Sequence, residues 1–145
     1  MAWVALLLGD EVRVHWWRLS TVEISDRLRK LNVEIADRET TGDKAWFEPV
    51  LHPEFRMRRA SGVTVTRDEF IGAVDRSAER RTEDVMGTEL DLTAAVICVV
   101  SMKDDDGTWK SFRNYRVFVR ADTAADWQLL GGRTNALVPR PTSSG

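Results

Sequence analysis

The sequence has few of the residues that most metal and nucleophile sites need, since it contains one cysteine and two histidines in 145 residues. Cys98 cannot form an internal disulfide, and it lies in an apolar run over 94–100, which predicts a buried, unreactive side chain. Two histidines without cysteine or glutamate at ligand spacing predict no metal site, and we expect no cofactor. The sequence also lacks a glycine-rich phosphate loop, a nucleophile elbow and a Cys-His pair.

Neither sign of charge dominates, because 21 basic residues are matched by 23 acidic ones and the formal net charge is −2. The arginines are spread along the chain with acids between them, so we expect no basic stripe and no nucleic-acid partner. The apolar run over 2–8 is far shorter than the roughly 20 residues of a membrane-spanning helix. It also lacks the flanking charge and the cleavage site of a secretory signal. We therefore expect no membrane partner and a cytoplasmic protein.

The length of 145 residues is typical of one domain. We assign 21–137 to that domain and 138–145, which has two prolines and two serines, to a flexible tail. Residues 1–20 are an N-terminal extension that holds three of the six tryptophans. Two interpretations of this extension stay open: a marginal hairpin that belongs to the domain, or a segment that precedes it, with translation starting near Val22.

Capping patterns and apolar spacing predict three helices. A capping pattern at Ser20 begins an amphipathic helix over 21–40, with apolar residues at helical spacing. Asp43 caps a second helix, which Pro49 keeps short. A full capping box begins a third helix over 67–80.

Strand-like runs rich in β-branched and aromatic residues accompany these helices, at 55–59, 63–66, 83–90, 94–103, 109–120 and 127–134. A Ser-Gly turn joins the first two runs into a hairpin. The turns between the last four are short, so these strands are expected to form an antiparallel meander. Helices followed by an antiparallel sheet predict an α+β fold.

Alternation divides the residues of the strand over 109–120 between two faces. We take as the inner face the one with two valines and a tyrosine: Arg113, Tyr115, Val117 and Val119. The outer face then holds Asn114, Arg116, Phe118 and Arg120. One bulge between Trp109 and Tyr115 would exchange the two faces.

Both faces of the run over 94–100 are apolar, which predicts a central strand covered on both sides. Helices can cover only one of these sides, so the outer side requires a partner. The apolar residues that we place on it are Ile97, Val99 and Phe118. We therefore expect a homodimer that forms through the outer face of the sheet.

Four short stretches occur in a characteristic order: TGDKAWF at 41–47, LHPEF at 51–55, TRDEFI at 66–71 and YRVFVR at 115–120. This order resembles the nuclear transport factor 2-like superfamily, which includes ketosteroid isomerase-like and SnoaL-like proteins, and within it the branch called domain of unknown function 4440. The resemblance covers about residues 22–136. It implies a cystatin-like topology in which N-terminal helices pack on a curved antiparallel sheet, forming a cone with an apolar pocket, in a protein that is commonly dimeric. It implies no single reaction.

The candidates for ligand binding in such a pocket are Trp46, His52, Met57, Arg113 and Tyr115. His52 and Tyr115 are also the catalytic candidates, because a histidine can act as a base near neutral pH and a tyrosine can donate to a ligand oxygen. Arg113 can pair with a ligand carboxylate. Each has an alternative explanation: a loop role before Pro53 for His52, a core tyrosine, and a rim arginine bonded to an acid.

An isomerase of the ketosteroid type needs a carboxylate base inside the pocket, and the inner-face positions assigned here supply none. We therefore expect a domain that binds a small, mainly apolar molecule. One alternative is an isomerase, polyketide cyclase or dehydratase-like enzyme that uses His52, Tyr115 or both on a small apolar substrate. The other is a dimerisation module without a ligand. An acid or a histidine that points into the cavity would favour the enzyme.

Overall fold

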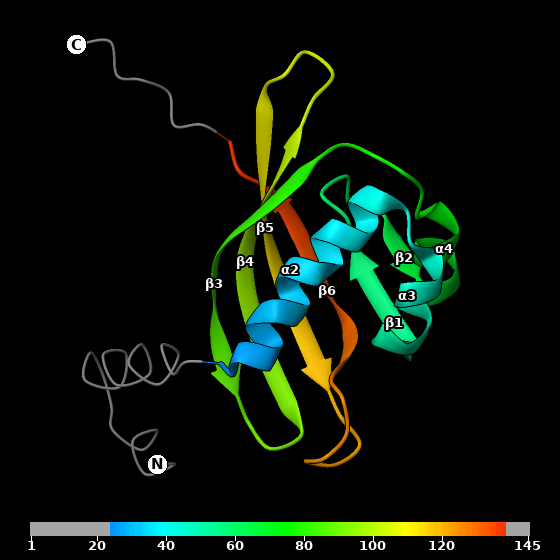
Figure 1. The fold of residues 1–145 in the computed structure, drawn as a ribbon, viewed down its shortest axis with the longest axis vertical. Helices are drawn as coiled ribbons and strands as arrows, with labels where there is room; N and C mark the ends of the chain where they lie inside the picture. The colour runs from blue at the N-terminus through cyan, green and yellow to red at the C-terminus, as the bar shows by residue number, and fades with distance from the viewer. Residues whose placement is uncertain (1–23, 139–145) are drawn as a thin grey trace, which may run out of the picture.

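The computed structural model describes residues 24–138, which form an α+β domain with helices packed on one face of a six-stranded sheet (Figure 1). The described elements, in chain order, are α2 (Asp26–Thr41), α3 (Lys44–Val50), β1 (Leu51–Arg58), β2 (Thr64–Thr66), α4 (Arg67–Ala73), β3 (Arg80–Glu89), β4 (Thr93–Lys103), β5 (Trp109–Val119) and β6 (Gln128–Ala136). This arrangement confirms the predicted fold class. The predicted N-terminal extension, and all but the first residue of the predicted tail, lie outside the described residues.

Helix α2 is the long amphipathic helix of the sequence prediction, but its start differs. Ser25 is its N-cap, and the Ser25 side chain accepts a hydrogen bond from the backbone N–H of Leu28. The predicted cap, Ser20, lies outside the described residues. At the other end Gly42 adopts a left-handed conformation with φ of 73°, which glycine tolerates without strain, and it donates to the Glu39 carbonyl.

The two shorter helices begin where their caps predict. Asp43 accepts from the backbone N–H of Trp46 at the start of α3, and Thr66 and Glu69 form the capping box of α4. Helix α4 ends at Ala73, so its predicted extension to residue 80 is wrong. Beyond it the chain bonds to the end of α2 instead: the backbone N–H of Ser77 donates to the Thr40 carbonyl at 3.1 Å.

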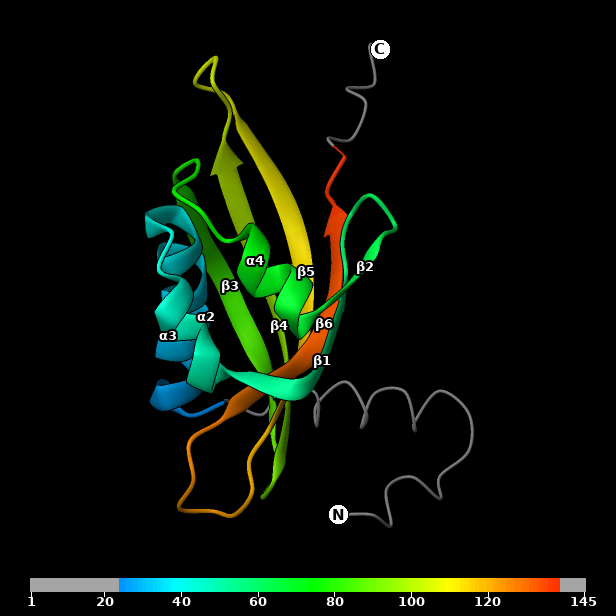
Figure 2. The same ribbon diagram turned by 90° about the vertical axis from the view of Figure 1, so that its right-hand side faces the viewer.

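The strand order in the sheet is β2-β1-β6-β5-β4-β3. Strands β3 to β6 form the predicted antiparallel meander, and β1 and β2 form the predicted hairpin. The parallel pairing of β1 with β6, which joins the hairpin to the meander, has no signal in the sequence. In Figure 2 the sheet is seen from the side and curves along α2, α3 and α4.

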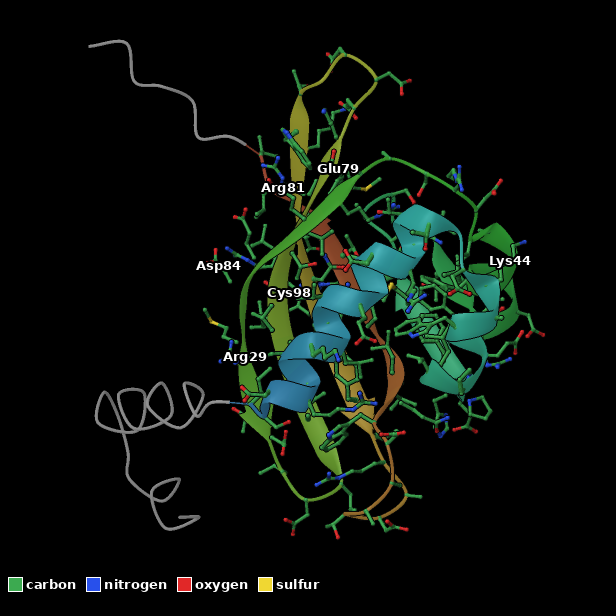
Figure 3. All side chains as sticks on the ribbon, viewed as in Figure 1. Arg29, Lys44, Glu79, Arg81, Asp84 and Cys98 are labelled. Carbon is green, nitrogen blue, oxygen red and sulfur yellow. The ribbon has the colours of Figure 1, made fainter. Side chains whose placement is uncertain are left out.

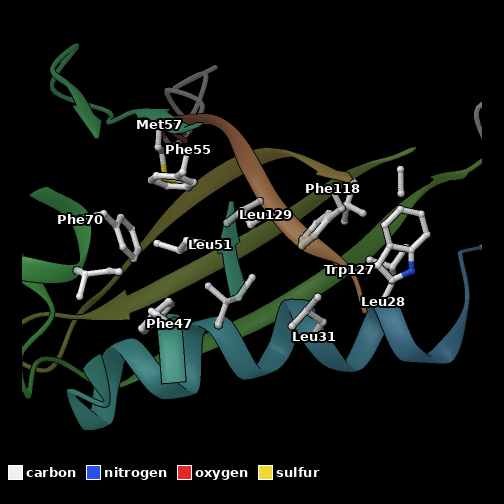
Figure 4. Close-up of a cluster of buried hydrophobic side chains, with 14 of the residues drawn as sticks. Leu28, Leu31, Phe47, Leu51, Phe55, Met57, Phe70, Phe118, Trp127 and Leu129 are labelled. Atoms are coloured by element: carbon white, nitrogen blue, oxygen red, sulfur yellow. The ribbon is translucent and has the colours of Figure 1, made fainter. Parts of the chain in front are cut away.

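The core lies between the helices and the concave face of the sheet. Figure 4 shows Leu28 and Leu31 of α2 facing Phe118 of β5, with the aromatic residues of α3, α4 and β1 at the other end. There the Phe70 ring packs edge-on against Phe47 and Phe55, with centroid distances of 5.4 and 5.3 Å. Such edge-to-face pairs add to the burial energy of the rings.

The prediction of which face of β5 points inward is wrong. Asn114, Arg116 and Phe118 are buried on the inner face, whereas Arg113 is exposed and Val117 is 38% exposed on the outer face. No bulge causes the exchange, because β4 and β5 pair without a register shift from Thr93↔Val119 to Lys103↔Trp109. The physical reason is that the outer face of β5 is itself partly apolar, so its valines do not mark the core. Phe118 therefore belongs to the core and not to the predicted dimer face.

Candidate functional site

A cavity of about 310 Å³ lies between the C-terminal half of α2, the end of β1, α4 and the meander strands. Its apolar walls come from six of these elements and include Ile35, Met57, Phe70, Val100, Met102, Phe112 and Leu129. Its main polar lining residues are Glu39, Arg59, Arg80, Asn114, Arg116 and Thr134. A smaller hollow of about 160 Å³ shares Glu39, Arg59, Phe70 and Arg80 with it, so these four residues stand where the two hollows meet.

Arg116 is the least exposed charged residue of this cavity, at 3% exposure. One terminal nitrogen, Nη1, donates to the side-chain oxygen of Asn32 at 3.0 Å and, more weakly, to its backbone carbonyl at 3.4 Å. The buried Nε of Arg116 has no hydrogen-bond partner. Within residues 24–138 no carboxylate lies within ion-pair distance of this guanidinium.

Asn32 fixes the orientation of the guanidinium. This residue of α2 is fully buried, and its side-chain amide donates to the Leu28 carbonyl at 2.7 Å. That bond leaves the Asn32 side-chain oxygen directed at Arg116. The partner is a neutral amide, so it satisfies hydrogen-bonding capacity without balancing the charge.

Cys98 does not supply the missing negative charge either. It lies on β4 behind α2 (Figure 3), is fully buried, and contributes to a small cluster with Ala36 and Val100. Burial raises the pKa of the Cys98 thiol, while the nearby Arg116 charge lowers it to a smaller extent. The thiol is therefore neutral at physiological pH.

The charges where the two hollows meet are already engaged. The Glu39 carboxylate lies 3.7 Å from a terminal nitrogen of Arg80, and Arg80 also donates to the Ser77 hydroxyl at 2.6 Å. Arg59 stacks over the Phe70 ring at 5.6 Å. Deeper in the sheet, the Thr134 hydroxyl donates to the side-chain oxygen of Asn114 at 2.9 Å.

Of the five residues predicted to bind a ligand, Met57 lines the cavity and four do not. The Trp46 ring packs edge-on against Phe47 at 5.0 Å, on the core side of α3. His52 is part of β1, and its Nδ1 accepts from the backbone N–H of Glu54 at 3.0 Å. Trp46 therefore packs against the core, and His52 holds the backbone of β1.

Arg113 and Tyr115 lie on the opposite face of the sheet from the cavity, which corrects the prediction that they point into it. Arg113 is exposed, and Tyr115 is half-buried beneath Arg133, whose guanidinium carbon lies 5.4 Å from the ring centroid. Neither predicted catalytic candidate, His52 or Tyr115, therefore lines the cavity.

The sequence prediction missed Asn114 and Arg116 as inward-facing residues. Their signal was present in the alternation, because they share a face with two aromatic residues, Phe112 and Phe118. The sequence prediction also missed Glu39 and Arg80 as residues that line the cavity. They come together because the end of α2 lies beside the start of β3, and no pattern in the sequence indicates that contact.

Among the described residues no group of three or more histidine, cysteine and acidic side chains could hold a metal ion. The helices of the 24–138 part are too short or too polar to cross a membrane. Chemically, the cavity offers apolar walls, the buried guanidinium of Arg116, a second guanidinium without an acidic partner among the described residues, that of Arg59 over the Phe70 ring, and one carboxylate, that of Glu39, which Arg80 already holds.

No family model and no curated protein matches the sequence. Solved structures do resemble the chain. An NTF2-like protein from Cytophaga hutchinsonii has a TM-score of 0.63 at 21% identity, covering 79% of this chain and 100% of that one. A protein with a cystatin-like fold from Caulobacter vibrioides has a TM-score of 0.65 at 13% identity, covering 79% and 89%. The S. rosetta CaMKII hub has a TM-score of 0.63 at 19% identity, covering 80% and 100%. At these identities the likeness concerns the fold, and the narrower branch named from the sequence is not confirmed.

Proposed function

We propose that this chain, which has the nuclear transport factor 2-like fold, binds a small and mainly apolar molecule in the cavity between its helices and its sheet. The observation that carries the proposal is the cavity itself: about 310 Å³, with apolar walls from six different elements and a few polar groups among them. Pockets of this composition, in the range of about 300–1,000 Å³, are the usual form of small-molecule sites. The volume is at the lower end of that range, so the ligand is small.

Filling the cavity tests this proposal. Val100 lines the cavity, whereas Val99, the next residue of β4, lies on the other face. The Val100→Phe variant is expected to keep its melting temperature and to lose the stabilisation by small apolar compounds that the wild type shows in thermal melts. The matched Val99→Phe variant is expected to retain that stabilisation. Equal responses of the two variants would show that compounds bind elsewhere.

The outer face of the sheet supports a second part of the proposal, that the chain forms a homodimer through it. Met86 and Ile97 pair across β3 and β4 and are 50% and 38% exposed, and Val117 on β5 is also 38% exposed. Contiguous exposed apolar residues on a soluble domain usually mark an interaction surface. The description of one structural neighbour as a hub is consistent with association.

A further inference from the structure

We propose that the ligand of the cavity is a small apolar carboxylic acid in its ionised form, and that Arg116 binds the carboxylate. This inference rests on the proposed binding function and adds the chemical class of the ligand. It starts from a buried cation for which the described part of the chain provides a neutral partner and no anion.

Among the described residues, the hydrogen bonds of Arg116 leave one edge of its guanidinium without a partner. Nη1 is engaged by Asn32. Nε is buried without a partner, and within residues 24–138 no hydrogen bond is formed by Nη2. Nε–H and one Nη2–H are parallel donors on the same side of the planar group, so together they match the two oxygens of a carboxylate.

The charge of Arg116 points to the same ligand class. A buried charge without a counter-ion is costly, and removing one partner of a buried pair typically costs several kcal/mol. The Cys98 thiol is neutral, and Glu39 is paired with Arg80. One carboxylate would balance the buried guanidinium of Arg116, whereas the other lining cation without an acidic partner among residues 24–138, Arg59, stacks over the Phe70 ring where the two hollows meet.

The apolar walls of the cavity indicate the chemistry of the part of the ligand that does not contact Arg116. Beyond Arg116 the walls include Ile35, Phe70, Phe112 and Leu129, which suit a short aliphatic chain or one aromatic ring. Asn114, next to Arg116 on the same face of β5, has its side-chain oxygen occupied by Thr134. The carboxylate end of the ligand is therefore placed at Arg116 and its apolar end along α2, α4 and β6.

Calorimetric titration with matched acid and alcohol pairs tests the inference on the full chain. The probes are 4-phenylbutyrate with 4-phenylbutan-1-ol, hexanoate with hexan-1-ol, and octanoate with octan-1-ol. The wild type is expected to bind the acid of at least one pair roughly tenfold or more tightly than the alcohol, because a hydrogen bond to a charged group contributes more than one between neutral groups. Arg116→Gln is expected to bind both members equally.

Arg113→Gln is the matched control, since it makes the same change in charge on the exposed face of the same strand. It is expected to keep the preference for the acid. If Arg116→Gln does not fold, Arg116→Lys replaces it: the charge remains but the two parallel donors do not, so most of the preference is expected to be lost.

The outcomes separate the two proposals. Equal binding of acid and alcohol by the wild type would overturn the carboxylate inference and leave the binding function standing. A preference for the acid that persists in Arg116→Gln as in Arg113→Gln would also overturn it. If the wild type binds no member of any pair, both the inference and the proposed function fail.

Discussion

Replacing Asn114 changes the charge of the cavity beside Arg116. Aspartate at this position keeps a side-chain oxygen that accepts from the Thr134 hydroxyl and gives up only the weaker hydrogen bond, at 3.4 Å, that the Asn114 amide donates to the Phe112 carbonyl. The new carboxylate would lie next to Arg116 on the inner face of β5, where it would balance the guanidinium and repel an anionic ligand.

Asn114→Asp is therefore expected to weaken 4-phenylbutyrate binding by roughly tenfold and to leave 4-phenylbutan-1-ol binding nearly unchanged. Asn135→Asp is the control, because Asn135 pairs with Arg113 on the outer face and does not line the cavity. Calorimetric titration of both variants measures the effect. Equal losses for acid and alcohol would indicate a distorted cavity and not charge repulsion.

Cys98 yields a prediction about alkaline stability. Because burial raises the pKa of its thiol in the folded protein, the unfolded chain loses its thiol proton first as the pH rises. The stabilising contribution is complete below the ordinary thiol pKa of about 8.5 and is lost as the pH rises toward the folded pKa. Urea unfolding is measured over a range of about two pH units that begins at about pH 8. Over this range the free energy of unfolding should fall more steeply with pH for the wild type than for Cys98→Ala. Parallel pH profiles would contradict it.

At the residue scale, burial of single apolar side chains was easier to predict from sequence than the position of Arg116. Cys98 is buried, as the apolar run over 94–100 predicts. Arg116 was assigned outward because the two valines and the tyrosine of β5 lie on the other face, and its hydrogen-bond partner Asn32 lies 84 positions away in the chain. A contact at that separation leaves no local pattern.

Among the elements, β6 carries the main structural constraint on the sheet. It is hydrogen-bonded to β1 on one side and β5 on the other, and two glycines, Gly131 and Gly132, lie in it. A Cβ on Gly132 would collide with the Tyr115 carbonyl oxygen, and one on Gly131 with the Arg56 carbonyl oxygen. The close approach of both neighbouring strands therefore requires residues without a side chain here.

Gly132→Ala is expected to destabilise the domain by about 1–3 kcal/mol, because backbone on β5 must move to admit the methyl group. Gly72→Ala on α4 is the control, since nothing lies near its Cβ position and alanine favours a helix. Urea unfolding of the two variants measures the difference. A Gly132→Ala variant as stable as the wild type would mean that the two strands can separate without cost.

Helix starts were predictable where a side chain caps them within a few residues, as Asp43 does for α3 and Thr66 for α4. The end of α4 was not, because the hydrogen bond from Ser77 to Thr40 that follows it joins two segments distant in sequence. The meander was predictable because its turns are short. The parallel contact of β1 with β6 was not, since no turn connects these strands.

For the whole molecule, the proposed dimer explains why apolar residues remain on the sheet face away from the helices. Ile97 lies near the middle of this face, with Met86 beside it on β3 and Tyr115 on β5. Ile97→Glu would place a charge at the centre of a symmetric interface, where each copy would repel the other.

Ile97→Glu is expected to be monomeric in light scattering at concentrations at which the wild type is dimeric. Val33→Glu is the control: Val33 is 40% exposed, comparable to Ile97 at 38%, but it lies on α2. It should remain dimeric. A wild type that stays monomeric at high concentration would refute the proposed interface.

Native mass spectrometry of the freshly purified wild-type chain, beside Val100→Phe, tests whether the cavity holds a small molecule. We expect an added mass of a small organic acid on the wild type, lost on denaturation and absent from Val100→Phe. An added mass that Val100→Phe retains, or a wild type that carries none and gains none on incubation with the acid probes, would contradict it.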